Sequence, residues 1–253
     1  MAAVLYNQHM RISRFYQDSE IQVGKKLDLS ATNHRHAIQV LRLKSGDDLI
    51  LFNGKAGEYA AKVLIADKRK SSVTIESHND VNRESNLKIT LGIANIKTDR
   101  MDFAIQKAVE LGVVVIQPLY TQRSVIKIKA NRLEKKMQHW QGIIIAACEQ
   151  SGRTAIPVLN QPINLDEMLL SCNNGSCIAM LPAATDKIND LKIKNNNQEI
   201  TLLIGPEGGF SADEEKMMLA NSVQAVNFGK RILRAETAVV AGMTTCQLAW
   251  GDL

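Results

Sequence analysis

The sequence lacks the features that would place it in a membrane or direct it to secretion. No window of its 253 residues approaches the roughly 18 consecutive apolar residues of a membrane span. The apolar run near Met1 is too short for the hydrophobic region of a signal peptide. Since 45% of the residues are apolar, the chain can bury a substantial core. We therefore expect a globular cytoplasmic protein with no membrane partner.

Cysteine is also scarce, which argues against a metal centre. The chain has four cysteines at irregular spacings, Cys148, Cys172, Cys177 and Cys246. The only close pair, in CNNGSC, lacks the second pair of ligands that a structural zinc site needs. We expect no metal ion, and free thiols that pack as small apolar side chains.

The charge of the chain favours an anionic partner only mildly. Thirty-one Lys and Arg against 26 Asp and Glu give a net charge of +5. The densest basic stretch, 123–136, holds a single acid, Glu134. This stretch is suited to binding nucleic acid, but a solvated helix entry explains it equally well.

The order of apolar patterns predicts two domains. Residues 10–81 carry short β-type runs separated by turn signals such as Asn53-Gly54, with one helical patch that ends at Gly46. They predict a small antiparallel barrel or sheet. After a polar linker, residues 86–253 alternate buried strands with amphipathic helices, one of them capped by Asp99. This second pattern predicts an α/β domain with a mostly parallel sheet covered by helices on both faces.

A glycine turn follows the apolar run of the stretch LLIGPEGGFSADE. A phosphate-binding loop needs a lysine directly after its last glycine, whereas Gly209 precedes Phe210. Pro206 removes a backbone donor, and Glu207 would repel a phosphate. Ser211 and Glu214 have the spacing of a capping box and predict a helix start. The turn is therefore suited to a neutral or cationic ligand.

A second loop with the same placement is FGKRILRAETA, at the end of another strand. It combines basic side chains with two good helix-start residues, Glu236 and Thr237. Its cations could simply form a surface turn. However, the carboxyl edge of a parallel sheet is where open α/β folds bind their ligands.

These two loops, together with IQKAVELGVVVIQPL and ACEQSGR, resemble the RsmE family of bacterial 16S ribosomal RNA uridine-N3 methyltransferases, of the SPOUT class. The resemblance begins at about Met10 and departs from the commoner pattern at Phe228, where a leucine is usual. It implies a PUA-like RNA-binding barrel over 10–81 and a SPOUT methyltransferase domain with a trefoil knot over 86–253. It also implies a homodimer that methylates N3 of a specific uridine in the decoding region of 16S ribosomal RNA, within the small subunit.

The resemblance implies S-adenosylmethionine as the cofactor, held by the two loops. The matching residues are Leu203, Ile204, Gly205, Pro206, Glu207, Gly208, Gly209, Phe228, Gly229, Ile232, Leu233, Arg234 and Thr237.

The implied reaction suggests candidate catalytic residues, and the implied RNA substrate suggests candidate RNA-binding residues. The uracil N3 proton must leave, and Arg234 is the first candidate to stabilise the resulting charge. The candidate bases are Glu149 and Glu236, with Glu207 as a further possibility, although glutamates at helix starts often only cap. The candidate RNA-binding residues are Arg14, Arg35, Arg42, Arg123, Lys127 and Arg153. The alternative is a non-catalytic ribosomal RNA-binding or ribosome-assembly factor of the same fold.

Overall fold

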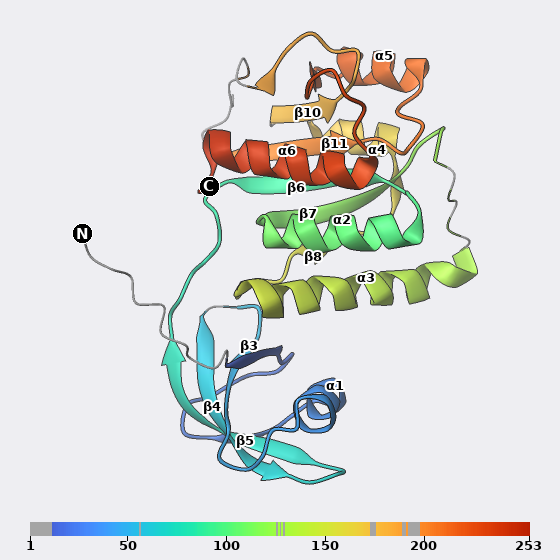
Figure 1. Cartoon of the computed structure of the whole chain (residues 1–253). Coiled ribbons are helices and arrows are strands. Elements are labelled where there is room, and N and C mark those ends of the chain that lie inside the picture. The colour runs from blue at the N-terminus through green and yellow to red at the C-terminus, as the bar shows by residue number, and fades with distance from the viewer. Residues whose placement is uncertain are drawn as a thin grey trace, which may run out of the picture. The chain divides into compact units, whose positions relative to one another are not determined.

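The computed structural model describes residues 12–253 except Ala56, Val125, Lys127, Lys129, 173–175, 189–190 and 192–197 (Figure 1). The chain divides into two compact units. The N-terminal unit runs to Arg83 and includes Glu149–Ala155, and the C-terminal unit comprises Glu84–Cys148 and Ile156–Leu253. The sequence did not indicate that Glu149–Ala155 belongs with the N-terminal unit.

The N-terminal unit is built on a five-stranded sheet with the order β1-β3-β4-β5-β2. Its strands are β1 (Ser13–Tyr16), β2 (Lys26–Asp28), β3 (Asp48–Phe52), β4 (Glu58–Ala66) and β5 (Ser71–Asn79). All neighbours pair antiparallel except β1 and β3, which are parallel. One face of the sheet packs a core that includes Phe15, Leu51 and Val73. The predicted small β domain is therefore present, with one parallel pair that the turn signals did not indicate.

The helical segment between β2 and β3 is shorter than the sequence pattern indicated. The helix α1 (Ala31–His34) continues as the π-helix η1 (Arg35–Val40). The hydroxyl of Ser30 caps it by accepting the N–H of Asn33 at 3.2 Å. The prediction that the helix reaches Gly46 is wrong, because Gly46 instead donates its N–H to the carbonyl of Val63 at 2.8 Å. The helix ends well before the turn that leads into β3.

The C-terminal unit is built on a seven-stranded parallel sheet, as predicted. The order is β12-β10-β11-β6-β7-β8, and β9 also pairs with β7. The strands are β6 (Lys88–Ala94), β7 (Val113–Tyr120), β8 (Val158–Leu159), β9 (Ile163–Asn164), β10 (Ser176–Met180), β11 (Glu199–Ile204) and β12 (Gln224–Val226). Because every pair is parallel, the carboxyl ends of the strands meet at one edge of the sheet.

Helices cover both faces of this sheet. They are α2 (Thr98–Glu110), α3 (Ala130–Ser151), α4 (Leu165–Ser171), α5 (Ala212–Ala220) and α6 (Ala235–Trp250). The helices α2 and α6 run side by side (Figure 1). A Cβ on Gly242 of α6 would lie 2.8 Å from Leu202, so α6 packs closely on that face. The neighbouring Leu203 points the other way, into a cluster with Met168 of α4 and Met218 of α5.

Two helix caps predicted from the sequence can be compared with the structure. Ser211 accepts the N–H of Glu214 at 3.1 Å, and Glu214 accepts the N–H of Ser211 at 2.8 Å. The predicted capping box is thus confirmed. The expected cap at Asp99 is wrong. The helix α2 begins at Thr98 with Lys97 at the cap position, so Asp99 lies within its first turn. All four cysteines are buried free thiols, as expected. Among the described residues, the helices include none that is long and apolar enough to cross a membrane.

Candidate active site

The two loops singled out in the sequence form opposite walls of one cavity in the C-terminal unit. The cavity has a volume of about 250 Å³ and lies at the carboxyl ends of β10 and β11. One wall is the glycine turn 204–210, and the other comprises Ile232, Leu233, Ala235 and Ala238. The two walls come together because their strands are parallel members of one sheet, with β10 between them.

The shape of the glycine turn depends on its last glycine. Gly209 has φ of +67° and donates its N–H to the carbonyl of Pro206 at 2.9 Å. A side chain would be strained at this φ, so glycine is required for the turn to close on itself. The apolar ring of Phe210 then lies buried in the core directly after the turn.

Most of the residues predicted to hold the cofactor line this cavity. They are Ile204, Gly205, Pro206, Glu207, Gly208, Gly209, Ile232 and Leu233. The sequence reasoning missed Met180, Leu181 and Pro182, which follow β10, and also Phe210, Glu215, Ala235 and Ala238. The stretch SCIAMLP carried a signal for the first three, because a buried strand that ends at a proline must also reach the carboxyl edge of the sheet.

The other predicted cofactor residues lie elsewhere. Leu203 is fully buried in the core. Phe228 and Gly229 line a different cavity of about 390 Å³. Arg234 and Thr237 are exposed and are not among the residues that line the 250 Å³ cavity.

Arg100, on α2, joins the two walls and was not singled out by the sequence. Its Nη1 lies 3.3 Å from Oε1 of Glu207, on the glycine turn. Its Nε lies 3.8 Å from Oε1 of Glu236, in the first turn of α6. The backbone N–H of Lys97 also donates to Oε1 of Glu207 at 3.4 Å. These contacts fix the carboxylates of both loops from outside the cavity.

The two catalytic candidates beside the cavity differ in how their side chains are engaged. Arg234 occupies the cap position of α6, and its guanidinium has no hydrogen-bond or ion-pair partner within the described part of the chain. The Oε2 atom of Glu236 is buried and also lacks a partner among those residues. Arg234 therefore has donors free to contact a ligand, whereas Glu236 holds an unpartnered acceptor that is shielded from solvent.

Glu149, the third candidate, has contacts within the N-terminal unit. Its Oε1 accepts the backbone N–H of Tyr16 at 2.9 Å, and its carbonyl accepts Nη1 of Arg14 at 3.4 Å. Burial raises the pKa of the Glu149 carboxyl above its ordinary value, although the hydrogen bond from Tyr16 opposes this shift. These contacts explain its burial without a catalytic role.

The predicted RNA-binding residues fall into two groups. Arg153 is buried, and the Arg14 side chain is only 11% exposed. Nη2 of Arg14 donates both to Oε2 of Glu58 at 3.1 Å and to the carbonyl of Arg153 at 3.2 Å. Arg35 and Arg42 are exposed on the N-terminal unit. The other two candidates belong to the basic stretch.

In that stretch, Arg123 is exposed and donates Nη1 to the carbonyls of Gly208 and Phe210, each at 3.0 Å. It therefore braces the glycine turn as well as presenting a charge to solvent. Lys127 lies outside the described residues.

Comparisons with known proteins agree with this geometry. Residues 83–247 match the RNA methyltransferase domain family, and residues 30–76 match the RNA methyltransferase PUA domain family. The chain is 36% identical to ribosomal RNA small subunit methyltransferase E of Buchnera aphidicola subsp. Schizaphis graminum, over 96% of this chain and 98% of that protein. It is 32% identical to the protein of the same name from Rickettsia conorii, over 94% and 96%.

A solved structure extends the likeness to three dimensions. Ribosomal RNA small subunit methyltransferase E of Neisseria gonorrhoeae, determined bound to S-adenosylmethionine, superposes with a TM-score of 0.88 at 36% identity. The alignment covers 96% of this chain and 99% of the other. The chain therefore belongs to the ribosomal RNA small subunit methyltransferase E family, whose members combine a PUA domain with a SPOUT-type RNA methyltransferase domain.

Proposed function

We propose that this protein transfers a methyl group from S-adenosylmethionine to N3 of one uridine in 16S ribosomal RNA. The observation that carries the proposal is the cavity between the glycine turn and the loop before α6, at the carboxyl edge of the parallel sheet. The three relatives named above align with 94% to 96% of this chain, and one of them was solved with that cofactor.

The charge and polarity of the cavity fit a sulfonium cofactor. Two carboxylates, Glu207 and Glu215, are among its lining residues, and the described lining contains neither lysine nor arginine. Arg100 pairs with Glu207 from outside the cavity, so Glu215 supplies the negative charge of the described lining that has no ion-pair partner among the described residues. This charge favours a cation over a nucleotide phosphate. Ile232 lines the cavity yet is 81% exposed, so a ligand with an apolar or aromatic part would cover surface that water now contacts. Ile204, Leu233 and the backbone of the turn would hold the remainder of the cofactor.

The cofactor, when bound, supplies an electrophilic methyl group on a positively charged sulfur. The contribution of the chain is to hold the uracil N3 in line with that methyl group and to exclude water. Arg234 has free guanidinium donors beside the cavity loop and would stabilise the negative charge that spreads over the uracil carbonyl oxygens. Glu236, with one unpartnered oxygen, is a better candidate than Glu149 for the group that accepts the N3 proton.

The RNA would be held mainly by exposed cations on both units. We assign phosphate contacts to Arg35, Arg42 and Arg123, which are exposed, and also to Lys127, which lies outside the described residues. The ion-paired Arg14 and the buried Arg153 instead stabilise the N-terminal unit. The target uridine must leave its stack for its N3 to reach the methyl group of the bound cofactor. We further propose that the protein acts in the cytoplasm on the small subunit, as a homodimer whose C-terminal domain is knotted.

The competing function is that of a non-catalytic RNA-binding or ribosome-assembly factor with the same fold. Calorimetric titration with S-adenosylmethionine separates the two, because a pure binding protein has no use for the cofactor. Binding in the micromolar range supports the proposal. An absence of binding up to millimolar cofactor would favour the assembly factor.

A further inference from the structure

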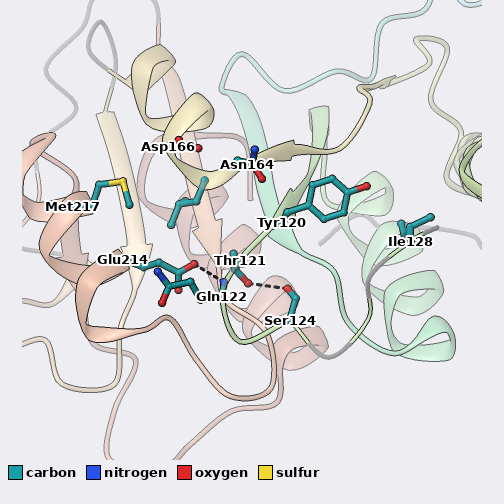
Figure 2. A pocket seen from close by; sticks show the side chains of 10 residues that line it. Tyr120, Thr121, Gln122, Ser124, Ile128, Asn164, Asp166, Glu214 and Met217 are labelled. Atoms are coloured by element: carbon teal, nitrogen blue, oxygen red, sulfur yellow. Dashed lines mark hydrogen bonds between the residues drawn. The ribbon is translucent and has the colours of Figure 1, made fainter. Parts of the chain in front are cut away.

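A second and larger cavity opens at the end of β7, on the other side of the first turn of α5. It has a volume of about 690 Å³. It is lined by Tyr120, Thr121, Gln122, Ser124, Ile128, Asn164, Leu165, Asp166, Glu214 and Met217 (Figure 2). Glu214 faces this cavity, whereas the next residue, Glu215, faces the cofactor cavity. The start of α5 thus lies between two adjacent cavities.

The polar floor of this cavity is held rigidly. The hydroxyls of Thr121 and Ser124 are buried and lie 2.7 Å apart. Since each hydroxyl carries one proton, only one of the two donates within the pair, and the other is left for a ligand. Both oxygens of Glu214 are already occupied, by the N–H of Gln122 at 2.7 Å and the N–H of Ser211 at 2.8 Å. Glu214 therefore fixes the floor and takes no ligand proton.

The atoms left over on the opposite wall are mainly acceptors. Oδ1 of Asp166 accepts the N–H of Glu167 at 2.9 Å, which leaves its Oδ2 without a hydrogen bond to the described residues. Asn164 uses its Nδ2 to donate to Oε1 of Glu167 at 3.0 Å, so its carbonyl oxygen faces the cavity side of the same turn. Figure 2 shows Asp166 and Asn164 together on one side of the cavity, above Thr121 and Glu214.

These features select a flat, neutral ligand with hydrogen-bond donors. A phosphate is disfavoured, because Asp166 and Glu214 are both acidic and the described lining has no lysine or arginine. Tyr120 and Met217 lie towards opposite ends of the cavity and offer surfaces for stacking (Figure 2). An unpaired nucleobase fits this description, and an exocyclic amino group would supply the donors that Asp166 and Asn164 can accept.

The cavity is also tied to the cofactor turn. Arg123, between the lining residues Gln122 and Ser124, donates to the carbonyls of Gly208 and Phe210 at 3.0 Å each. We propose that this second cavity receives an unpaired RNA base with an exocyclic amino group, close in the RNA to the methylated uridine. This inference rests on the proposed function, because it takes the ligand to be part of the RNA substrate.

Cytosine and uracil provide the sharpest test, since they have the same size and differ only along the edge formed by positions 3 and 4. Cytosine has an amino donor at position 4 and an acceptor at N3, whereas uracil has a carbonyl at position 4 and an N–H donor at N3. Binding of fluorescent oligocytidylate and oligouridylate heptamers is measured at one salt concentration, with and without saturating S-adenosylmethionine. We expect the cytidine oligomer to bind about threefold to tenfold more tightly. Asp166→Asn should abolish this preference, because the amide that replaces Oδ2 can donate to the uracil carbonyl.

The matched control is Asp213→Asn, which removes an exposed carboxylate from the first turn of α5 without touching the cavity lining. It should keep the preference for cytidine. Equal affinities of the two oligomers for the unmodified protein, or a preference that survives Asp166→Asn, would overturn the inference. The titration with S-adenosylmethionine alone reports separately on the proposed function, so a failure of the inference can be distinguished from a failure of the proposed function.

Discussion

Arg14 of the N-terminal unit and Arg234 of the C-terminal unit carry the same charge in opposite surroundings. The Arg14 side chain is 11% exposed, binds Glu58, and lies with its guanidinium carbon 4.9 Å from the centre of the Phe52 ring. Arg234 is exposed at the start of α6, beside a loop that lines the cavity of about 250 Å³. A buried arginine with a carboxylate partner stabilises its own unit, whereas an exposed one beside a cavity is available to a ligand.

The largest effect should come from Arg234→Ala. If Arg234 stabilises the charge on the uracil, turnover should fall about 100- to 1000-fold, as when one donor to a developing anion is removed. The affinity for S-adenosylmethionine should change by less than about threefold. Methyl transfer to small subunits at saturating cofactor, together with calorimetry, measures both quantities.

The control for that loss is Arg69→Ala, which removes an exposed arginine of the N-terminal unit. Its turnover should stay within about twofold of the unmodified protein, as expected for a surface change away from the site. If Arg234→Ala lost cofactor affinity and turnover equally, Arg234 would be a binding residue and the contrast with Arg14 would need revision.

Arg14→Ala should instead lower stability. It leaves the buried carboxylate of Glu58 with Arg83 as its remaining ion-pair partner and removes the donor to the carbonyl of Arg153. The free energy of unfolding of the N-terminal unit should fall by about 2–4 kcal/mol. Urea unfolding measures this fall, and Arg35→Ala, at an exposed position of the same unit, should cost less than about 0.5 kcal/mol. Equal losses of stability in the two variants would contradict a structural role for Arg14.

Arg100→Ala tests whether a cation outside the cavity positions both of its walls. Among the described residues, the loss of Arg100 leaves Glu207 with the N–H of Lys97 alone and removes the ion-pair partner of Glu236. The affinity for S-adenosylmethionine should fall about threefold to tenfold, since partly exposed ion pairs contribute about 1 kcal/mol. Arg100→Lys should recover part of the loss. Calorimetry that found no change in either variant would show that the two loops hold their shape unaided.

The smallest effect concerns Glu149 and pH. Burial raises the pKa of Glu149 in the folded protein above its ordinary value of 4.5, so the folded state holds this proton more tightly than the unfolded state. The contribution of Glu149 to stability is therefore lost as pH rises through the window from 4.5 to the raised pKa. Glu149→Gln keeps the acceptor for the N–H of Tyr16 but removes the titration.

Urea unfolding at several pH values above 4.5 should thus show the unmodified protein losing stability relative to Glu149→Gln. Turnover of the variant should be nearly unchanged. A relative gain in stability with pH would contradict the sign of the shift, and a large loss of turnover would restore Glu149 as a candidate base.

The parts of the site that could be predicted from the sequence are those set by neighbouring residues. The capping box of Ser211 and Glu214 and the glycine turn before it depend on spacings of a few residues. The parallel sheet follows from buried apolar runs that alternate with helical patterns. Such signals are local, and they predicted the glycine turn 204–210 that forms one wall of the cavity.

The contacts that the sequence did not predict join residues that are far apart along the chain. Arg100 meets Glu207 across 107 positions, and Glu149 meets Tyr16 across 133. A side chain that pairs at such a separation leaves no periodicity and no spacing in the sequence. For the same reason, a count of basic residues could not distinguish Arg14, whose side chain is ion-paired and 11% exposed, from the exposed Arg234.

Mass mapping of 16S ribosomal RNA after reaction in vitro directly tests whether this protein methylates N3 of one uridine. Small subunits from cells that lack this protein are incubated with S-adenosylmethionine and either the unmodified protein or Arg234→Ala. The account predicts one uridine that gains a methyl group at N3 with the unmodified protein, and nearly none with the variant. Methylation of a different base or atom, or equal methylation by both proteins, would contradict it.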